Sequence, residues 1–241
     1  MVEIACGSCY NQYMIYSISD LHLGTSVDKP MEIFGKKWEG HFDKIKQDWL
    51  MKVSSDDVVL IAGDISWAMS LEDAKGDIES IAALPGKKVL LKGNHDYWWQ
   101  SLGKVRGILP ADFYVVQNDV VRIGRYLFCG SRGWTTESDA EEDKKIYARE
   151  LIRLELSLKE MEKERREGDV VVGMTHFPPF DVTMEATPVT ELFTKHGVNT
   201  VVYGHLHGNS YAKRCAFIGG ARYLLTSCDL VDFKLVEVVK D

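Results

Sequence analysis

The sequence predicts a single α/β domain in which buried parallel strands alternate with helices. Continuous apolar runs at 58–62 and 89–91 are short, and the first is rich in β-branched side chains, which is typical of parallel strands covered on both faces. Apolar residues at helical spacing lie between these runs, over 71–84, and Pro85-Gly86 ends that helix. A chain of 241 residues can bury a sizeable core, and α/β folds of this length are often one domain.

Composition and charge limit the classes of function. Apolar residues make up 45% of the chain and charged residues 27%, which is ordinary for a soluble globular protein. The net charge of −7 argues against a general binder of nucleic acid or of anionic membranes, unless bound cations offset a local cluster of carboxylates. No run approaches transmembrane length, and no leader precedes a cleavage site, so we expect a cytoplasmic protein without a membrane partner.

The five cysteines do not predict a disulfide framework. Their odd number and scattered positions favour reduced thiols. Cys6 and Cys9 have the spacing of a zinc or redox pair, but no second pair accompanies them, so incidental thiols are the favoured interpretation. Residues 1–13 are polar and weakly patterned, and we expect them to be an N-terminal extension outside a single domain over 14–241.

Three strands in the first half of the chain end in side chains that bind metals or transfer protons. The strand over 14–20 leads into Asp20 and His22, which face the same side of an extended chain and suit one ion together. The next strand ends at Asp64, and the third leads into Gly-Asn-His-Asp at 93–96. Taken singly, these groups are explained equally well by surface turns or by helix caps. Their repetition at three strand ends is hard to explain by turns.

The second half of the chain combines antiparallel strands, a long helix and two further strands that end in histidine. One of these two strands ends at His176, and the other leads into Gly-His-Leu-His-Gly at 204–208. Two further helices are expected, one over 38–53 and one that follows 97–99 and runs to about 109. Consecutive antiparallel strands are expected at 113–116, 120–123 and 126–129, and closing strands at 223–227 and 233–239. A long amphipathic helix is expected over 141–167 and another helix near 189–196.

Collected, the strand ends form one set of carboxylate, amide and imidazole groups. Five of the seven histidines fall there, whereas structural histidines should be scattered. Nitrogen and oxygen ligands without a thiolate suit two divalent cations, and we expect Mn, with Fe or Zn as alternatives. An aspartate such as Asp64 can bridge two ions about 3.5–4 Å apart. The predicted metal ligands are Asp20, His22, Asp64, Asn94, His176, His205 and His207.

These motifs, in this order, resemble those of the calcineurin-like metallophosphoesterases. The resemblance covers about residues 14–207. The closer resemblance is to a bacterial and archaeal group of predicted phosphohydrolases without an assigned substrate. This group carries the motifs Asp-Lys-Pro-Met, here at 28–31, Gly-Asp-Ile-Ser-Trp, here at 63–67, and Gly-Asn-His-Asp-Tyr-Trp-Trp, here at 93–99. The resemblance implies a β-sandwich of two mixed sheets flanked by helices, with metals at the carboxyl ends of the strands.

The resemblance also implies a role for each group of residues. A hydroxide that bridges the two ions would attack phosphorus in line. His95 would contact the transition state and protonate the leaving group, with Asp96 supporting it. Asp64 would be shared between an ion held by Asp20, His22 and His207 and an ion held by Asn94, His176 and His205.

The chain also departs from two branches of this family. Protein phosphatases carry phosphate-binding arginines in the segments that follow Gly-Asp and Gly-Asn-His. This chain has Ile-Ser-Trp at 65–67 and Tyr-Trp-Trp at 97–99 instead, so a phosphoprotein substrate is disfavoured. Purple acid phosphatases place a metal-binding tyrosine where this chain has Trp67, so no iron–tyrosinate centre is expected. Arg132 is a candidate replacement for the missing arginines, although an exposed loop arginine is the favoured interpretation. Trp98 is a candidate for stacking on a planar substrate, and a place in the core is its alternative.

We therefore predict a metal-dependent phosphohydrolase, a phosphodiesterase or phosphatase, that acts on a small organic phosphoester. A non-catalytic scaffold on the same fold is the alternative from another class. Scaffolds of this family have lost ligands or the histidine of Gly-Asn-His, and this chain keeps all of them. A nuclease is a second alternative, but the acidic balance disfavours stable binding of nucleic acid. The oligomeric state and the choice between monoesters and diesters stay open.

Overall fold

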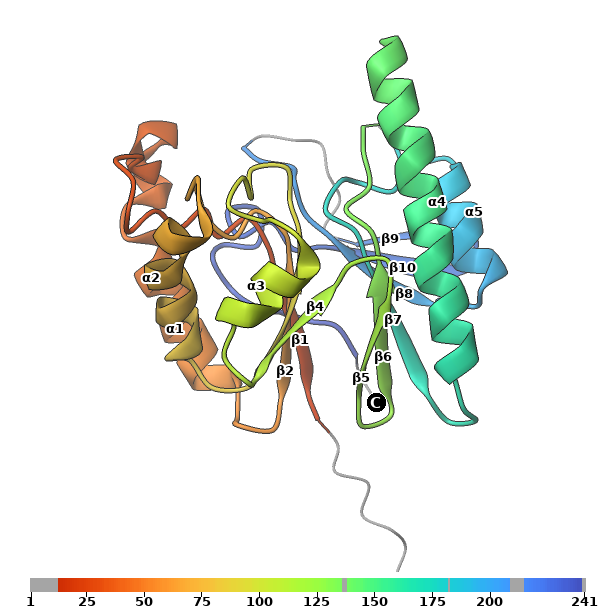
Figure 1. Cartoon of the computed structure of the whole chain (residues 1–241), viewed down its shortest axis with the longest axis horizontal. Coiled ribbons are helices and arrows are strands. Elements are labelled where there is room, and N and C mark those ends of the chain that lie inside the picture. Colours follow the sequence, from red (N-terminus) through yellow and green to blue (C-terminus); the bar gives the residue numbers. More distant parts are fainter. Residues whose placement is uncertain (1–12, 136–137, 182, 209–214, 240–241) are drawn as a thin grey trace, which may run out of the picture.

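Two mixed β-sheets face each other in the computed structural model, and helices cover their outer faces (Figure 1). The structure describes residues 13–135, 138–181, 183–208 and 215–239. One apolar core lies between the sheets, and two others lie between each sheet and its helices. The predicted α/β class and the two-sheet sandwich are therefore confirmed.

The first sheet has the strand order β11-β1-β2-β3-β4 and is parallel except at β11. Helices α1 (His41–Lys52), α2 (Leu71–Ala82) and α3 (Leu102–Ile108) cover it, and two short 3₁₀ turns, η1 (Met31–Phe34) and η2 (Lys36–Trp38), precede α1. Its strands are β1 (Ile15–Ile18), β2 (Val58–Ala62), β3 (Lys87–Leu91), β4 (Phe113–Val116) and β11 (Val236–Glu237).

The continuous apolar character of β2 follows from burial on both of its faces. Val59 and Ile61 pack toward the helices, whereas Val58, Leu60 and Ala62 pack toward the second sheet. Successive side chains of a strand point to opposite faces, so a strand between two covered faces needs apolar residues at every position.

The second sheet has the order β5-β6-β7-β8-β10-β9, with β5 and β9 antiparallel at its two edges. The predicted amphipathic stripe of α4 (Glu141–Glu164) packs on this sheet beside α5 (Pro188–Lys195), as Figure 1 shows. Its strands are β5 (Val120–Ile123), β6 (Tyr126–Gly130), β7 (Val170–Met174), β8 (Thr200–Tyr203), β9 (Cys215–Ile218) and β10 (Ala221–Leu225).

Two predictions about strands are wrong. The three consecutive antiparallel strands are in fact split between the sheets: β4 pairs in parallel with β3, and only β5 and β6 are antiparallel to each other. Helix α3 returns the chain to the sheet it left, which makes the next strand parallel. Strand β9 was not predicted. The predicted closing strand at 233–239 is shorter and consists of β11 alone, because Phe233 and Leu235 pack in the core between the first sheet and its helices.

The two sheets join at one edge. The backbone N–H of Ser19, just after β1, donates to the carbonyl of Thr226 at 2.9 Å, and the N–H of Cys228 donates back to the Ser19 carbonyl at 3.1 Å. These bonds hold the carboxyl ends of β1 and β10 together. The polar residues that follow β1, β2 and β3 therefore meet those that follow β7 and β8.

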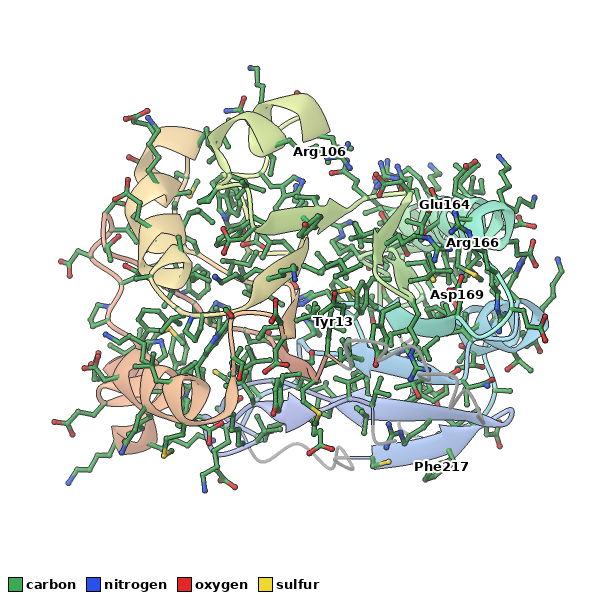
Figure 2. The ribbon with its side chains drawn as sticks, turned by 90° about the horizontal axis from the view of Figure 1, so that it is seen from below. Tyr13, Arg106, Glu164, Arg166, Asp169 and Phe217 are labelled. Carbon is green, nitrogen blue, oxygen red and sulfur yellow. The ribbon has the colours of Figure 1, made fainter. Side chains whose placement is uncertain are left out.

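Tyr13 is the described residue of the predicted N-terminal extension, whose residues 1–12 lie outside the described part of the chain. Tyr13 packs on Tyr126, with ring centroids 6.5 Å apart, and lies between the strands of the two sheets in Figure 2. Cys6 and Cys9 lie outside the described residues. Among the described cysteines, Cys129 is buried and unpaired. No helix within the described ranges combines the length and the apolar character needed to cross a bilayer.

Candidate metal centre

One cluster of donors combines groups from both sheets. Asp20 and His22 follow β1, and His207 follows β8. The Nε2 atoms of His22 and His207 lie 3.3 Å apart, and the Nε2 atom of His207 lies 3.4 Å from Oδ1 of Asp20. All three residues offer a ligand atom within 4.8 Å of the others, which is the arrangement expected of groups that share one cation.

A second cluster lies beside the first. Asp20, Asp64 and His176 also bring one ligand atom each within 4.8 Å of one another. The amide oxygen of Asn94 lies 2.8 Å from Nε2 of His176 and 2.9 Å from Nδ1 of His205. The structure therefore brings all seven predicted metal ligands together at the joined edge of the two sheets.

Asp20 belongs to both clusters, and Asp64, a member of the second cluster, also reaches toward the first. The Oδ2 atom of Asp64 is 3.8 Å from Nε2 of His22 in the first cluster and 3.4 Å from Nε2 of His176 in the second. Its other oxygen, Oδ1, accepts the backbone N–H of His95 at 2.8 Å. One carboxylate oxygen thus faces both clusters, while the other is held by the backbone.

The backbone at the site is strained and closely packed. Asp20, His22, Asp64 and His205 have φ angles of 59°, 46°, 53° and 72°, in the left-handed region that most residues avoid and that is common at functional sites. A Cβ atom on Gly93 would lie 2.0 Å from Oδ1 of Asp64. Glycine at 93 is therefore required for the β3 loop to approach the Asp64 carboxylate.

Hydrogen bonds orient two of the imidazoles. Nδ1 of His176 lies 2.9 Å from the carbonyl of Ala62, and Nδ1 of His207 lies 2.9 Å from Oδ1 of Asp229. Donation through Nδ1 leaves each Nε2 lone pair free to face a cation. The other oxygen of Asp229 accepts from Lys37 at 3.0 Å. Sequence reasoning missed Asp229, although its place shortly after β10, another strand end at this edge, was a usable signal.

The charge balance of the site also fits divalent cations. Burial lowers the pKa of His22 and of His205 to about 4, so both are neutral ligands near pH 7. Burial alone would lower the pKa of His176 and His207 as well, but Asp64 raises the first to about 9, and Asp20 with Asp229 raises the second to about 10. In the cation-free protein these two protons offset carboxylate charge, which bound cations would otherwise do.

His95 differs from the other histidines of the site. Its half-buried ring lies beside the ring of Trp67, with centroids 4.6 Å apart, and its Nδ1 is buried without a partner among the described residues. Both His95 and Trp67 line the same pocket, next to His22. The side chain is therefore positioned beside the candidate ligands without belonging to either cluster.

The expected support of His95 by Asp96 has to be corrected. The fully buried Asp96 carboxylate accepts the backbone N–H groups of Gly93, at 2.7 Å, and of Ile65, at 2.8 Å. Further donors to this carboxylate are the backbone N–H groups of Asp64 and Ser66 and the indole N–H of Trp98. Five donors occupy the carboxylate, so it ties the loops after β2 and β3 together instead of orienting His95.

The proposal that Trp98 stacks on substrate is wrong. Trp98 is 0% exposed and donates its indole N–H to Asp96, so the core alternative holds. Trp67 does lie at the site, because its ring stacks on His22 with centroids 4.6 Å apart and 17° between the planes. Trp67 also lines a pocket of about 310 Å³ that includes His22, His95 and His207. The remaining wall residues of this pocket are Met31, Phe34, Lys37, Trp38, Gly208 and Asp229.

Arg132 lies near the clusters but in a different pocket. Its backbone carbonyl accepts the N–H of His176 at 3.0 Å. Its guanidinium lies over the ring of Trp134, 4.6 Å from the centroid, and 3.6 Å from the Glu150 carboxylate. The arginine is therefore held in place rather than loosely exposed, and its role in substrate binding stays a prediction.

Comparisons with known proteins identify the family and the fold. A family model described as calcineurin-like phosphoesterase matches residues 13–209. The chain is similar in structure to the phosphopantetheinyl hydrolase of Mycobacterium tuberculosis, with 14% identity, 96% of this chain and 98% of that chain covered, and a TM-score of 0.60. It is also similar to a protein of unknown function from Aquifex aeolicus, with 18% identity, 93% and 95% covered, and a TM-score of 0.50. No curated protein matches the chain. The chain belongs to the calcineurin-like phosphoesterase family.

Proposed function

We propose that the protein is a dinuclear, metal-dependent phosphohydrolase that cleaves a phosphoester bond of a small organic molecule. The observation that carries the proposal is the position of Asp64, whose Oδ2 atom faces His22 of one donor cluster and His176 of the other. Family membership supports metal-dependent phosphoester chemistry in general, and the two donor clusters support a pair of ions.

The residues around the clusters have separate tasks in this proposal. Two divalent cations, Mn or alternatively Fe or Zn, would lower the pKa of a water molecule between them and offset charge on the phosphoryl oxygens. Asp64 would hold the pair, and its Oδ1 atom fixes the backbone of His95. His95 would then present its imidazole to the leaving-group oxygen and donate a proton there.

The apolar pocket supports a small organic leaving group. Its volume of about 310 Å³ lies at the lower end of ligand pockets, and Met31, Phe34 and Trp67 supply apolar wall beside His95. An alcohol seated against these side chains would place its oxygen near the imidazole. The net charge of −7 disfavours a long nucleic acid at the same place.

A panel of phosphoesters, assayed after metal removal and with Mn, Zn, Fe and Mg in turn, tests the proposal. The panel holds bis-nitrophenyl phosphate, nitrophenyl phosphate, cyclic nucleotides, single-stranded DNA and a phosphopantetheine ester, the last because a similar solved structure is described as a phosphopantetheinyl hydrolase. We expect metal-dependent turnover of small esters. Processive cleavage of DNA with weak activity on every small ester would favour a nuclease, and no turnover with any metal would favour the scaffold.

Two matched variants test the pocket. Phe34 is 60% exposed at the pocket wall, and Phe217 is 74% exposed on β9, at the edge of the second sheet (Figure 2). We expect Phe34→Ala to raise KM for aryl esters several-fold more than for methyl esters, because it removes apolar wall, whereas Phe217→Ala leaves both unchanged. An equal effect of Phe34→Ala on aryl and methyl esters would contradict the assignment.

A further inference from the structure

A second pocket lies near the metal centre, and it is separate from the pocket beside His95. It has a volume of about 140 Å³ and lies at the carboxyl ends of β3, β4 and β6, the same edge of the sheets as the metal ligands. Most of the residues that line it are polar or charged, in contrast to the aromatic pocket beside His95. Its lining includes Lys92, Gln117, Ser131, Arg132, Glu150 and Arg153.

The charges of this pocket do not balance. Among the residues that the structure describes, three cationic side chains and one carboxylate, that of Glu150, line it. Glu150 is 3% exposed and accepts from Arg153 at 2.6 Å, with Arg132 at 3.6 Å. Within the described part of the chain Lys92 has no ion-pair partner, and its Nζ lies 3.5 Å from the carbonyl of Trp99. The described lining thus carries two more positive than negative charges.

Arg132 adds an unused donor to this excess charge. Its Nε atom is buried and has no hydrogen-bond partner among the residues that the structure describes. A buried donor without an acceptor costs free energy, and cations brought together away from water repel one another. A bound anion would relieve both costs, and guanidinium groups match the geometry of phosphate and carboxylate oxygens.

The pocket is also within reach of the metal centre. Lys92 precedes the candidate ligand Asn94 by two residues, so their Cα atoms lie at most roughly 7 Å apart. The carbonyl of Arg132 accepts the N–H of the candidate ligand His176 at 3.0 Å. The lining of the pocket and the candidate metal ligands are therefore neighbours along the backbone.

We propose that this basic pocket is an anion-binding subsite that takes a second phosphate or carboxylate group of the substrate. The proposal rests on the phosphohydrolase function proposed above and narrows its substrate class. The substrate is a phosphoester that carries a further anionic group, with the scissile phosphate at the metal clusters and the second anion at Lys92, Arg132 and Arg153.

Alkane bisphosphates of two to six carbons, each compared with the alkyl monophosphate of equal length, provide the test. We expect the wild-type protein to show a lower KM for the bisphosphate at one preferred length. Lys92→Gln and Arg153→Gln should each raise that KM about 10- to 100-fold, the loss typical of a hydrogen bond to a charged group, and raise the monophosphate KM far less. Lys163→Gln is the matched control, because Lys163 pairs with Glu160 on α4 as Arg153 pairs with Glu150.

Three results would overturn the subsite. The first is an equal KM for bisphosphate and monophosphate at every length in the wild type, and the second is an equal rise of KM for both esters in the variants. The third is that free inorganic phosphate changes monophosphate turnover in the wild type but not in Lys92→Gln while bisphosphates are not preferred, since the pocket would then bind an effector instead of the substrate.

Failure of the hydrolase function is distinguishable from failure of the subsite. If the wild type turns over neither ester with any metal, the Kd of the preferred bisphosphate is measured by calorimetry instead. A Kd that Lys92→Gln raises at least ten-fold, and Lys163→Gln does not change, supports the subsite without any catalysis. An unchanged Kd in Lys92→Gln overturns it.

Discussion

At the scale of single residues, His95 is the histidine of the site that faces a pocket without joining a donor cluster. We predict that His95→Ala keeps both metals and the fold but loses turnover by about 10²- to 10⁴-fold, the usual contribution of an acid–base group. His196→Ala is the control, because His196 pairs with Glu162 at 2.8 Å, away from the clusters. Metal content and steady-state kinetics of both variants check the prediction.

The leaving group separates proton donation by His95 from other roles. Nitrophenyl esters need no proton on their leaving oxygen, so the loss in His95→Ala should shrink for them and stay large for alkyl esters. An equal loss on both kinds of ester would assign the imidazole to another task, such as contact with the phosphoryl group.

The protons on two histidines predict how metal affinity depends on pH. Despite burial, the pKa of His176 is raised to about 9 by Asp64, and that of His207 to about 10 by Asp20 and Asp229, so both imidazoles are protonated at pH 7 without metal. A cation must displace these protons. The affinity for the metal ions should therefore rise between pH 6.5 and 9, and binding should release protons. Titration calorimetry in buffers of different ionisation enthalpy measures both the affinity and the number of protons released. Affinity that stays constant over this range would contradict the assigned protonation.

The seven candidate ligands were predictable because each comes just after a strand or in a Gly-flanked motif, and the ends of parallel strands meet at one edge. Asp229 was not predicted because its role depends on the return of the chain after β10 to His207, a contact between residues 22 positions apart. The role of Asp96 was mistaken for a similar reason. Its five donors come mainly from the loop after β2, which sequence spacing does not place beside residue 96.

At the scale of elements, the Asp96 carboxylate connects the loops after β2 and β3. We predict that Asp96→Asn destabilises the fold by about 1–3 kcal/mol, because an amide offers one acceptor oxygen where the carboxylate serves five donors. The variant should also bind metal more weakly, since the backbone of Asp64 loses its anchor. Urea unfolding and metal titration of Asp96→Asn and of the exposed control Asp43→Asn measure both effects. Equal stability and metal affinity in the two variants would contradict this role.

Element types were easier to predict from the sequence than element partners. The stripe of apolar residues that ends at Met161 predicted α4, and the continuous apolar run predicted β2. The partner of β4 was not predictable from its own residues, because parallel and antiparallel pairing both suit a short apolar strand. Strand β9 was missed because its alternating burial includes the exposed Phe217 at the sheet edge.

At the scale of the whole molecule, the candidate centre connects the two sheets. Four of the ligands follow strands of the first sheet, and the three histidines His176, His205 and His207 follow strands of the second. Binding of cations should therefore stabilise the whole domain against unfolding. We predict that Mn at 100 times its Kd stabilises the protein by about 2.7 kcal/mol and raises Tm, and that a chelator reverses the change. Calorimetric scans with and without Mn measure this, and binding that leaves Tm unchanged would contradict a centre shared by both sheets.

The hydrophobic pattern of the sequence does not predict that the two sheets pack face to face. A strand such as β2 is apolar on both faces whether a helix or a second sheet covers it, so its residues predict burial but not the identity of the cover. The resemblance carried by the ordered motifs predicted the sandwich. The bonds of Ser19 to the segment after β10 are the physical reason that the sheets meet at the site.

Elemental analysis of the wild type and of Asp64→Asn measures whether a pair of ions is shared through Asp64. We predict two divalent ions per chain in the wild type. We predict that Asp64→Asn loses at least one ion and nearly all activity, because a neutral amide bridges poorly between the positions near His22 and His176. Two ions retained in Asp64→Asn, or a single ion in the fully active wild type, would contradict a pair shared through Asp64.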